Sequence, residues 1–235
     1  MKLMKTYALI VAGGSGRRFG GGIPKQYQLV AGKPVISWTI SRFEVAQTID
    51  AIVIVAAEDY LLYVNNQVVN PYDFRKVAKI VPGGETRMES VMKGLESLPI
   101  SAGFVAIHDS VRPLVKPSDI DLVTLEARNN RAAILARPVS ETVKRSRDGV
   151  IMATIDRKNL YLAETPQVFQ YDLIKEAYLK GKEKGLEATD DASLVENLGF
   201  MVKLIPSSGP NPKLTTKDDL KYFTMLLEGE TGVRF

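Results

Sequence analysis

Short apolar runs alternate with amphipathic stretches along the first part of the chain. The apolar runs are rich in β-branched residues, which is typical of strands buried on both faces. We expect strands at residues 7–11, 51–56, 79–81, 104–107 and 132–136. The stretches between them place apolar residues on one helical face, and we expect helices at residues 35–43, 87–98 and 120–127. This alternation predicts βαβ units and therefore an α/β protein with a Rossmann-like, mostly parallel sheet flanked by helices.

The pattern changes between residues 139 and 160, where polar and apolar residues alternate. Residues 142–147 and 150–155 flank an Asp148-Gly149 pair, which is typical of the turn of an antiparallel β-hairpin. An isolated two-stranded hairpin is marginally stable in water, so this one should pack against something. The pattern leaves two placements open: an arm that packs on a second subunit, or an edge hairpin of the same sheet.

The rest of the chain returns to the helical pattern. We expect helices at residues 173–184, 192–198 and 217–227, with a strand at residues 201–205. Composition does not shift along the chain in a way that marks a second domain. We therefore expect a single domain over residues 1–235, with residues 139–160 as a protruding β-arm.

Composition excludes several kinds of chemistry. The 235 residues are 45% hydrophobic and 25% charged, as in ordinary globular proteins. The chain has no cysteine and one histidine, His108, which rules out disulfides, thiol nucleophiles and multi-histidine metal sites. The net charge of +4 suits a small anionic substrate and is too weak to indicate nucleic acid. No apolar run approaches the ~20 residues that a membrane span requires, so we expect a cytoplasmic protein with no membrane partner.

A glycine-rich segment, Ala12-Gly13-Gly14-Ser15-Gly16, directly follows the first expected strand. Glycines let the backbone approach a ligand closely, and ligands of open parallel sheets bind beyond the carboxyl ends of the strands. The segment lacks the Gly-Lys-Ser/Thr of a P-loop, and Phe19 stands where a dinucleotide site needs glycine or alanine. Arg18 and Lys25 instead bracket the loop, which favours a triphosphate site over a plain turn with solvated cations.

The segment and Pro24-Lys25-Gln26-Tyr27 together resemble the signature of the sugar and alditol phosphate nucleotidyltransferases. Later motifs resemble one family among them, the 2-C-methyl-D-erythritol 4-phosphate cytidylyltransferases. These motifs lie at residues 83–87 with Ser90, and at residues 108–113, 141–144, 156–157, 165–167, 189–192 and 211–215. The resemblance covers nearly the whole chain, and the later set in this order is far more specific than the glycine-rich segment.

The resemblance implies a cytidylyltransferase that joins CTP and the phosphate of 2-C-methyl-D-erythritol 4-phosphate and releases pyrophosphate. It implies Mg²⁺ held mainly by CTP, with Asp109 the nearest protein carboxylate, and a homodimer joined by the arm. The catalytic cations would be Arg18, Lys25 and Lys213. The CTP-binding residues would be Ala12, Gly13, Gly14, Ser15, Gly16, Gly84, Glu85, Ser90, Asp109 and Ser110. The acceptor-binding residues would be Arg112, Thr189 and Lys213 of one subunit, with Thr142 and Arg157 from its partner.

Several residues in these motifs also have purely structural interpretations. Arg112 could pair with Asp109 and brace a loop. Asp190 and Asp191 are best explained as a helix cap. His108 is expected to be a structural histidine at a strand end, and residues 165–167 could be a loop beside the substrate or only a turn.

Three positions depart from the commonest family pattern. Gly13 stands where alanine is more usual, Glu164 replaces glutamine, and Pro212 replaces an aliphatic residue. They keep ribitol-5-phosphate cytidylyltransferase as an alternative, although residues 189–193 resemble the erythritol enzymes better. A non-catalytic nucleotide sensor is a second alternative, which would be expected to lose Lys25 or Lys213, and both are present.

Overall fold

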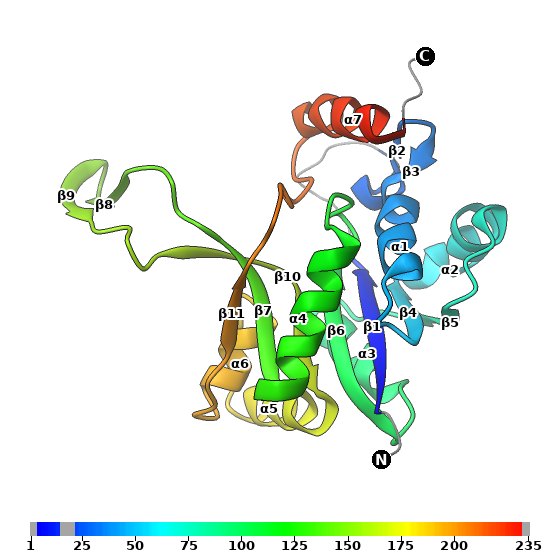
Figure 1. Ribbon diagram of the computed structural model, residues 1–235, viewed down its shortest axis with the longest axis horizontal. Coiled ribbons are helices and arrows are strands. Elements are labelled where there is room, and N and C mark those ends of the chain that lie inside the picture. The colour runs from blue at the N-terminus through cyan, green and yellow to red at the C-terminus, as the bar shows by residue number, and fades with distance from the viewer. Residues whose placement is uncertain (1–3, 15–21, 232–235) are drawn as a thin grey trace.

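A seven-stranded sheet forms the centre of the computed structural model, which describes residues 4–14 and 22–231 (Figure 1). Its strand order is β11-β7-β10-β6-β1-β4-β5. The strands are β1 (Lys5–Ala12), β4 (Ala51–Ala56), β5 (Val77–Pro82), β6 (Ala102–Asp109), β7 (Ala132–Pro138), β10 (Tyr161–Gln170) and β11 (Lys203–Pro206). β10 runs antiparallel to both of its neighbours, and the other neighbouring pairs are parallel. The mostly parallel sheet that the sequence predicts is confirmed.

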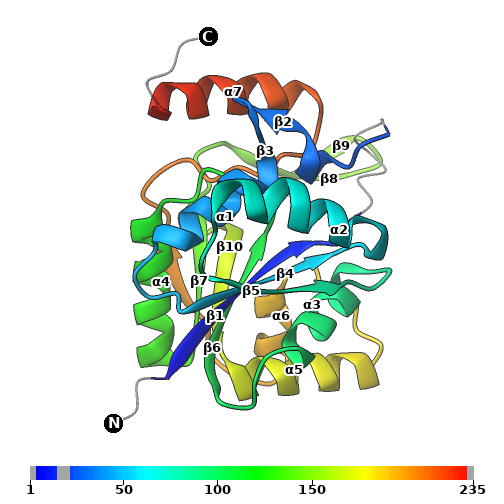
Figure 2. The same cartoon turned by 90° about the vertical axis from the view of Figure 1, so that its right-hand side faces the viewer.

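Helices cover both faces of this sheet (Figure 2). One face carries α1 (Val35–Val45) and α4 (Pro117–Asn130), and the other carries α3 (Arg87–Glu96), α5 (Tyr171–Glu183) and α6 (Asp191–Glu196). Every residue of β6 is buried, because this central strand is covered from both sides. Burial of each large aliphatic side chain contributes about 1.5–3 kcal/mol, which explains why the central strands are continuously apolar.

Two smaller groups of elements complete the fold. The C-terminal α7 (Asp218–Thr231) packs over β2 (Leu29–Val30), β3 (Lys33–Pro34) and α1, around Trp38. After β4 the chain forms consecutive short helical turns, for which the sequence pattern gave no prediction. They are η3 (Glu58–Tyr60), α2 (Leu61–Tyr63), η4 (Val64–Val69) and η5 (Asn70–Tyr72), and they lie beside the short turn η2 (Lys25–Tyr27).

Strand β10 corrects the interpretation of residues 165–167 as a loop or turn. These residues lie inside β10, between β6 and β7. The ladder with β7 is interrupted between Ala163 and Gln167, where Pro166 lacks the N–H that a regular ladder needs. A run that contains proline and several polar residues does not have the pattern of a central strand, which is why the sequence did not predict one.

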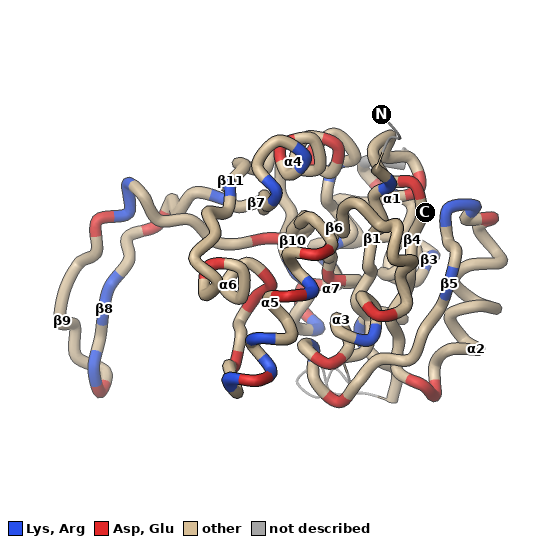
Figure 3. Tube along the Cα trace, turned by 90° about the horizontal axis from the view of Figure 1, so that it is seen from below, with Lys and Arg blue, Asp and Glu red and all other residues tan. Residues whose placement is uncertain are grey.

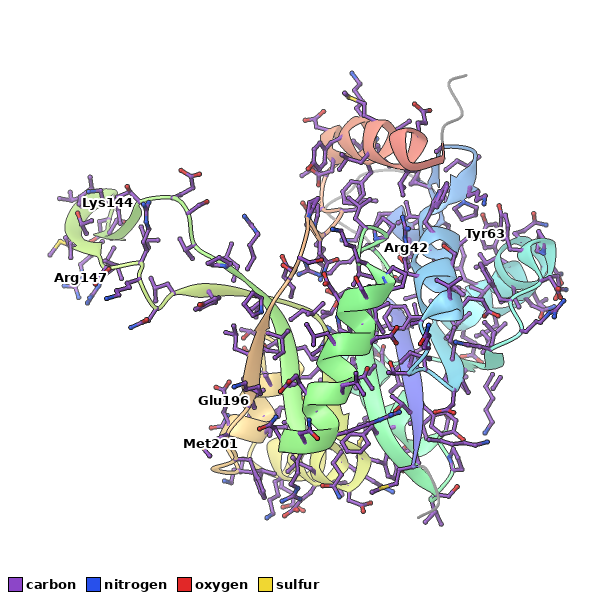
Figure 4. The ribbon with its side chains drawn as sticks, viewed as in Figure 1. Arg42, Tyr63, Lys144, Arg147, Glu196 and Met201 are labelled. Carbon is purple, nitrogen blue, oxygen red and sulfur yellow. The ribbon has the colours of Figure 1, made fainter. Side chains whose placement is uncertain are left out.

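The predicted hairpin is present as β8 (Val143–Arg147) and β9 (Val150–Ile155). Asp148 and Gly149 both have positive φ values, 51° and 79°, as a two-residue hairpin turn requires. The hairpin forms its own two-stranded sheet and projects from the body, with Lys144 and Arg147 far from the central sheet (Figure 4). The alternative of an edge hairpin of the main sheet is therefore wrong. Within the described ranges, no helix is long and apolar enough to cross a membrane.

Candidate active site

The carboxyl edge of the sheet brings the predicted site residues together. β1 and β6 are adjacent parallel strands, and Val11 lies opposite Asp109 in their register. The glycine-rich segment that starts at Ala12 therefore begins beside the end of β6. Ser110, also a predicted CTP contact, is buried there and donates its N–H to the Val11 carbonyl oxygen. This is the edge at which ligands of open α/β sheets bind.

Asp109 is the electrostatic centre of this edge. Its Oδ2 lies 2.9 Å from Lys213 Nζ and 3.6 Å from Arg112 Nε, and its Oδ1 lies 3.4 Å from Arg87 Nε. Burial alone would raise the pKa of Asp109, but the charges of Arg87, Lys213 and Arg112 hold it well below its usual value. Asp109 is thus ionised and surrounded by cations drawn from three separate segments of the chain.

Arg112 has the bracing contacts that its structural interpretation requires. Besides its ion pair with Asp109, it donates from Nη1 to the backbone oxygen of Asn211 at 2.6 Å. Asn211 in turn donates from Nδ2 to the carbonyl oxygen of Thr165. Arg112 therefore ties the end of β6 to the segment that carries Lys213.

Arg87 is held in place by a buried carboxylate. Its Nη1 and Nη2 donate to the two carboxylate oxygens of Asp191, at 2.8 and 2.7 Å. Tyr178 donates its hydroxyl to the same fully buried carboxylate. Burial alone would lower the pKa of Arg87, but Asp191 and Asp109 raise it above its usual value. Arg87 thus links α3, α6 and Asp109.

The cap interpretation of the two aspartates is confirmed for one and wrong for the other. Asp190 is the N-cap of α6 and accepts the N–H of Ser193. Asp191 instead points inward as the partner of Arg87. The sequence gives little signal for this pair, because its members are 104 residues apart and each lies in an ordinary helix start.

The two predicted lysines approach one segment of the chain. Lys25 Nζ donates to the carbonyl oxygen of Leu214 at 3.0 Å, and Lys213 is the preceding residue. Tyr27, at the end of the same short turn, stacks on Tyr60 with ring centroids 4.8 Å apart. The stacking anchors the turn, so Lys25 and Lys213 are brought to the same region by contacts that span most of the sequence.

Three of the predicted CTP-binding residues, Gly84, Glu85 and Ser90, form a tight loop beside the start of the glycine-rich segment. Ser90 is buried, accepts the Gly84 N–H at 3.0 Å and donates to the Thr86 carbonyl oxygen at 2.9 Å. The Glu85 N–H is bound by the Glu89 carboxylate at 2.8 Å. A Cβ on Gly13 would lie 2.8 Å from Ser90 Oγ, so glycine at this position permits the close approach.

His108 is a structural histidine, as the sequence predicts. Its Nδ1 lies 3.1 Å from Thr165 Oγ1 and its Nε2 lies 3.2 Å from the Arg112 carbonyl oxygen. Burial lowers the pKa of His108 to about 3, although Asp109 acts in the opposite direction. The ring is therefore neutral near pH 7 and is fully buried.

Three other predicted residues are exposed in the single chain. Thr142 and Arg157 are exposed at the base of the arm, where Arg157 donates to the Ser140 carbonyl oxygen. Thr189 is exposed just ahead of α6. Ser15, Gly16 and Arg18 lie outside the described residues.

The capacity of the site for a metal ion rests on Asp109. The part of the chain that the structure describes holds no group of three or more acidic or histidine side chains placed to bind a metal. Mg²⁺ is commonly held by one or two carboxylates together with substrate phosphates and water. Asp109 fits this limited role, because it is ionised and lies at the ligand-binding edge. It would exchange its contact with Arg87 or Lys213 for the ion.

Fold and site together define the class. A mostly parallel α/β sheet, with converging cations at its carboxyl edge where a glycine-rich sequence follows β1, is that of the α/β nucleotidyltransferases. The family model described as 2-C-methyl-D-erythritol 4-phosphate cytidylyltransferase matches residues 6–228. The chain belongs to this family.

Relatives and solved structures agree with this assignment. The chain is 41% identical over 229 residues to the 2-C-methyl-D-erythritol 4-phosphate cytidylyltransferase of Pelotomaculum thermopropionicum, covering 97% of this chain and 96% of the relative. It is 42% identical over 225 residues, 95% of this chain, to the bifunctional enzyme IspD/IspF of Desulforudis audaxviator, and spans 57% of that enzyme's length. The crystal structure of 4-diphosphocytidyl-2C-methyl-D-erythritol synthase from Anaerococcus prevotii has a TM-score of 0.85, at 28% identity over 96% of both chains.

Proposed function

We propose that this protein transfers the cytidylyl group of CTP to the phosphate of 2-C-methyl-D-erythritol 4-phosphate. The products are 4-diphosphocytidyl-2-C-methyl-D-erythritol and pyrophosphate. The observation that carries the proposal is that Lys213 pairs with Asp109 at the edge where the glycine-rich segment begins, while Lys25 bonds to the carbonyl oxygen of the adjacent Leu214. Family membership supports the choice of nucleotide and acceptor.

The reaction needs positioning and charge neutralisation more than proton transfer. An acceptor phosphate oxygen attacks the α-phosphorus of CTP, and the bond to the pyrophosphate oxygen breaks. The nucleophile is already an anion near neutral pH, so no strong base is required. The buried, neutral state of His108 and the absence of cysteine agree with this chemistry. Fixed cations aimed at the reacting phosphates then supply the main catalytic effect.

Lys25 and Lys213 are assigned to the reacting phosphates. Lysine acts on phosphate as a point charge, and its flexible stem allows Lys25 to exchange the Leu214 carbonyl for a phosphate oxygen. The Asp109 carboxylate holds Lys213 and so keeps its charge at the site before substrates arrive. Arg18 is assigned to the triphosphate from the sequence, by its place beside the glycine-rich segment.

The loop from Gly83 to Ser90 is assigned to the cytosine base. The N–H groups of Gly84 and Glu85 are already bound within the loop by Ser90 and Glu89. The carbonyl oxygens of Gly83 and Thr86 already accept from Lys93 and Ser90, but each has a second lone pair and can still accept from a base, whereas a bonded N–H has no further hydrogen to donate. Cytosine carries an exocyclic amino group that donates hydrogen bonds, whereas uracil has an acceptor there. The loop thus favours CTP over UTP.

A divalent cation is part of the proposal, with Mg²⁺ the expected ion. It would be held mainly by the triphosphate oxygens and water, with Asp109 as the one protein carboxylate. When bound, it supplies further neutralisation of the phosphate charge. A cytoplasmic location stays a prediction from the sequence.

The arm, residues 139–160, is assigned to a homodimer in which Thr142 and Arg157 complete the acceptor pocket of the partner. It projects from the body, and basic residues lie along β8 (Figure 3). Val150, Ile151 and Met152 on β9 are each at least 60% exposed in the single chain. Contiguous apolar side chains on a projecting hairpin are typical of an interaction surface.

Pyrophosphate release is the experiment that tests the proposed function. The protein would be assayed with CTP and Mg²⁺, with 2-C-methyl-D-erythritol 4-phosphate and ribitol 5-phosphate in parallel. We expect release with the first acceptor and little with the second. Release with ribitol 5-phosphate alone would reassign the acceptor, and no release with either would contradict the proposed activity. UTP in place of CTP tests the assignment of the base-binding loop.

A further inference from the structure

Gln26 connects the short turn that carries Lys25 to the start of the glycine-rich segment. Its side chain is 2% exposed and sits in the short turn that also carries Lys25. Its Nε2 donates to the carbonyl oxygen of Ala12 at 2.7 Å and to that of Gly14 at 3.1 Å. A primary amide has two N–H donors, so both are directed at the glycine-rich segment.

The two bonded carbonyls are the ones that matter for an anionic ligand. They lie on either side of Gly13, in a segment whose glycines allow the peptide groups to rotate with little steric cost. A carbonyl oxygen turned toward a triphosphate repels it, whereas a backbone N–H attracts it. The amide of Gln26 therefore fixes where the carbonyl oxygens of Ala12 and Gly14 point.

We propose that Gln26 is a positioning residue for CTP, which holds the carbonyls of Ala12 and Gly14 away from the triphosphate. The inference rests on the proposed function, because it assigns the triphosphate to this segment. Gln26 acts through the backbone and touches no reacting atom. One short turn thus carries the Lys25 cation and also holds the carbonyl oxygens of Ala12 and Gly14.

The surroundings of Gln26 make the turn a rigid support. Tyr27 is buried and packs against the rings of Tyr60 and Tyr63, with centroids 4.8 and 5.0 Å away. A side chain held in this way delivers its hydrogen bonds at a fixed position. The effect of Gln26 should therefore depend on the N–H groups of its side-chain amide. A side chain of the same size without these donors should not replace it.

Gln26→Glu is the sharpest test, because it keeps the shape and makes the donor depend on pH. The ionised carboxylate would face two carbonyl oxygens without a hydrogen to donate, and burial would raise its pKa. When protonated, it donates again to one of them. We expect the KM for CTP to rise roughly 10- to 100-fold at high pH, the scale of one to two lost buried hydrogen bonds. The defect should shrink as the pH falls, with the KM for the acceptor nearly unchanged.

Two further variants separate positioning from general damage. Gln26→Met keeps the volume without any donor, so its KM for CTP should be raised at every pH. Gln28→Glu is the matched control, because Gln28 lies two residues away and donates to the carbonyl oxygen of Ile23 on the surface. This control should retain wild-type kinetics and lack the new pH dependence.

Calorimetric titration with CTP alone measures CTP binding without the reaction. It therefore tests the role of Gln26 separately from the proposed activity. Wild-type protein that binds CTP but releases no pyrophosphate would overturn the activity, while the binding of CTP by the Gln26 variants would still test Gln26. Weaker CTP binding by both variants, relieved at low pH only in Gln26→Glu, is the expected result. Unchanged CTP binding in both, or equal losses for CTP and acceptor with no pH dependence, would overturn the positioning role.

Discussion

Asp109 shows how one side chain can organise the charges of a site. Three cations approach its two oxygens, and each comes from a different part of the chain. Their combined charge keeps Asp109 ionised, and Asp109 in turn limits the mutual repulsion of the cations. Asp109 thus holds three cationic side chains close together at the edge of the sheet. A polyanionic substrate then meets cations that are already in place, which lowers the reorganisation needed for catalysis.

Loss of Lys25 tests this arrangement at a single residue. Lys25→Ala should lower turnover roughly 10²- to 10³-fold, the scale for one electrostatic donor, because the reacting phosphate loses a point charge. The measurement is pyrophosphate release at saturating CTP. Lys180→Ala removes an exposed lysine that pairs with Glu176 on α5 and serves as the control. Near-normal turnover in Lys25→Ala would contradict the assignment.

His108 predicts a pH dependence of stability. Its pKa is lowered to about 3 in the folded protein and is near 6.5 when unfolded, so below pH 6.5 the unfolded chain binds a proton that the folded chain does not. Falling pH should therefore remove about 2 kcal/mol of the free energy of unfolding between pH 7 and pH 5. Urea denaturation of wild type and His108→Gln should show this loss in wild type alone. Equal slopes with pH in both would contradict a buried, neutral histidine.

Among the elements, the strands that could be predicted from the sequence are those with apolar surroundings on both faces. β1, β4 and β6 are covered by helices on both faces, so their residues are continuously apolar and the pattern is plain. β10 carries Glu164, Thr165 and Gln167 because it lies beside the site and bonds to neighbouring loops. Its polar residues serve those local contacts, and the strand pattern is lost. The helical turns at residues 58–72 escaped prediction because each is too short to show a period.

The candidate site also contains residues that the sequence identifies and contacts that only the structure shows. Lys25 could be singled out by its place after the glycine-rich segment, and Asp109 and Lys213 by the resemblance of their motifs to the family. Partnerships such as Arg87 with Asp191 could not, because a contact across 104 residues leaves no local pattern. The three-dimensional fold alone shows which aspartate caps a helix and which one binds an arginine.

The loop before α3 leads to a prediction about Gly84. A Cβ at this position would lie 2.3 Å from Glu89 Cβ, which belongs to the first turn of α3 and cannot move alone. Gly84→Ala should displace this turn together with Ser90 and raise the KM for CTP by roughly tenfold, with a stability cost of about 1–3 kcal/mol. Steady-state kinetics and thermal denaturation measure the two effects. Gly229→Ala, which has open space around its Cβ on α7, should change neither.

For the whole molecule, the proposal that two chains share each site can be tested by mixing variants. In a mixed dimer of Lys213→Ala and Arg157→Ala chains, one site would hold both defects and the other would be intact. Each variant alone should be nearly inactive, whereas the mixed dimer should regain up to half of the wild-type activity per dimer. Differently tagged chains allow the mixed species to be purified and assayed for pyrophosphate release.

The matched control for this experiment pairs Lys213→Ala with Lys25→Ala. Both lysines lie near Leu214 of the same chain, so every site of this mixed dimer keeps one defect. No activity should return. Both mixed species must first be shown to be dimers. If the dimer of Lys213→Ala and Arg157→Ala chains is then no more active than the control dimer, Arg157 acts within its own chain.

The contacts that close the site also bear on how the protein is made. All seven strands of the main sheet are complete by Pro206, yet Lys213 and Leu214 come later. Their bonds to Asp109 and Lys25 span 104 and 189 residues. A ribosome therefore delivers the whole sheet before it delivers the segment that joins the two ends of the chain at the site. A product cut short after β11 would keep every strand of the sheet and lack the lysine that completes its chemistry.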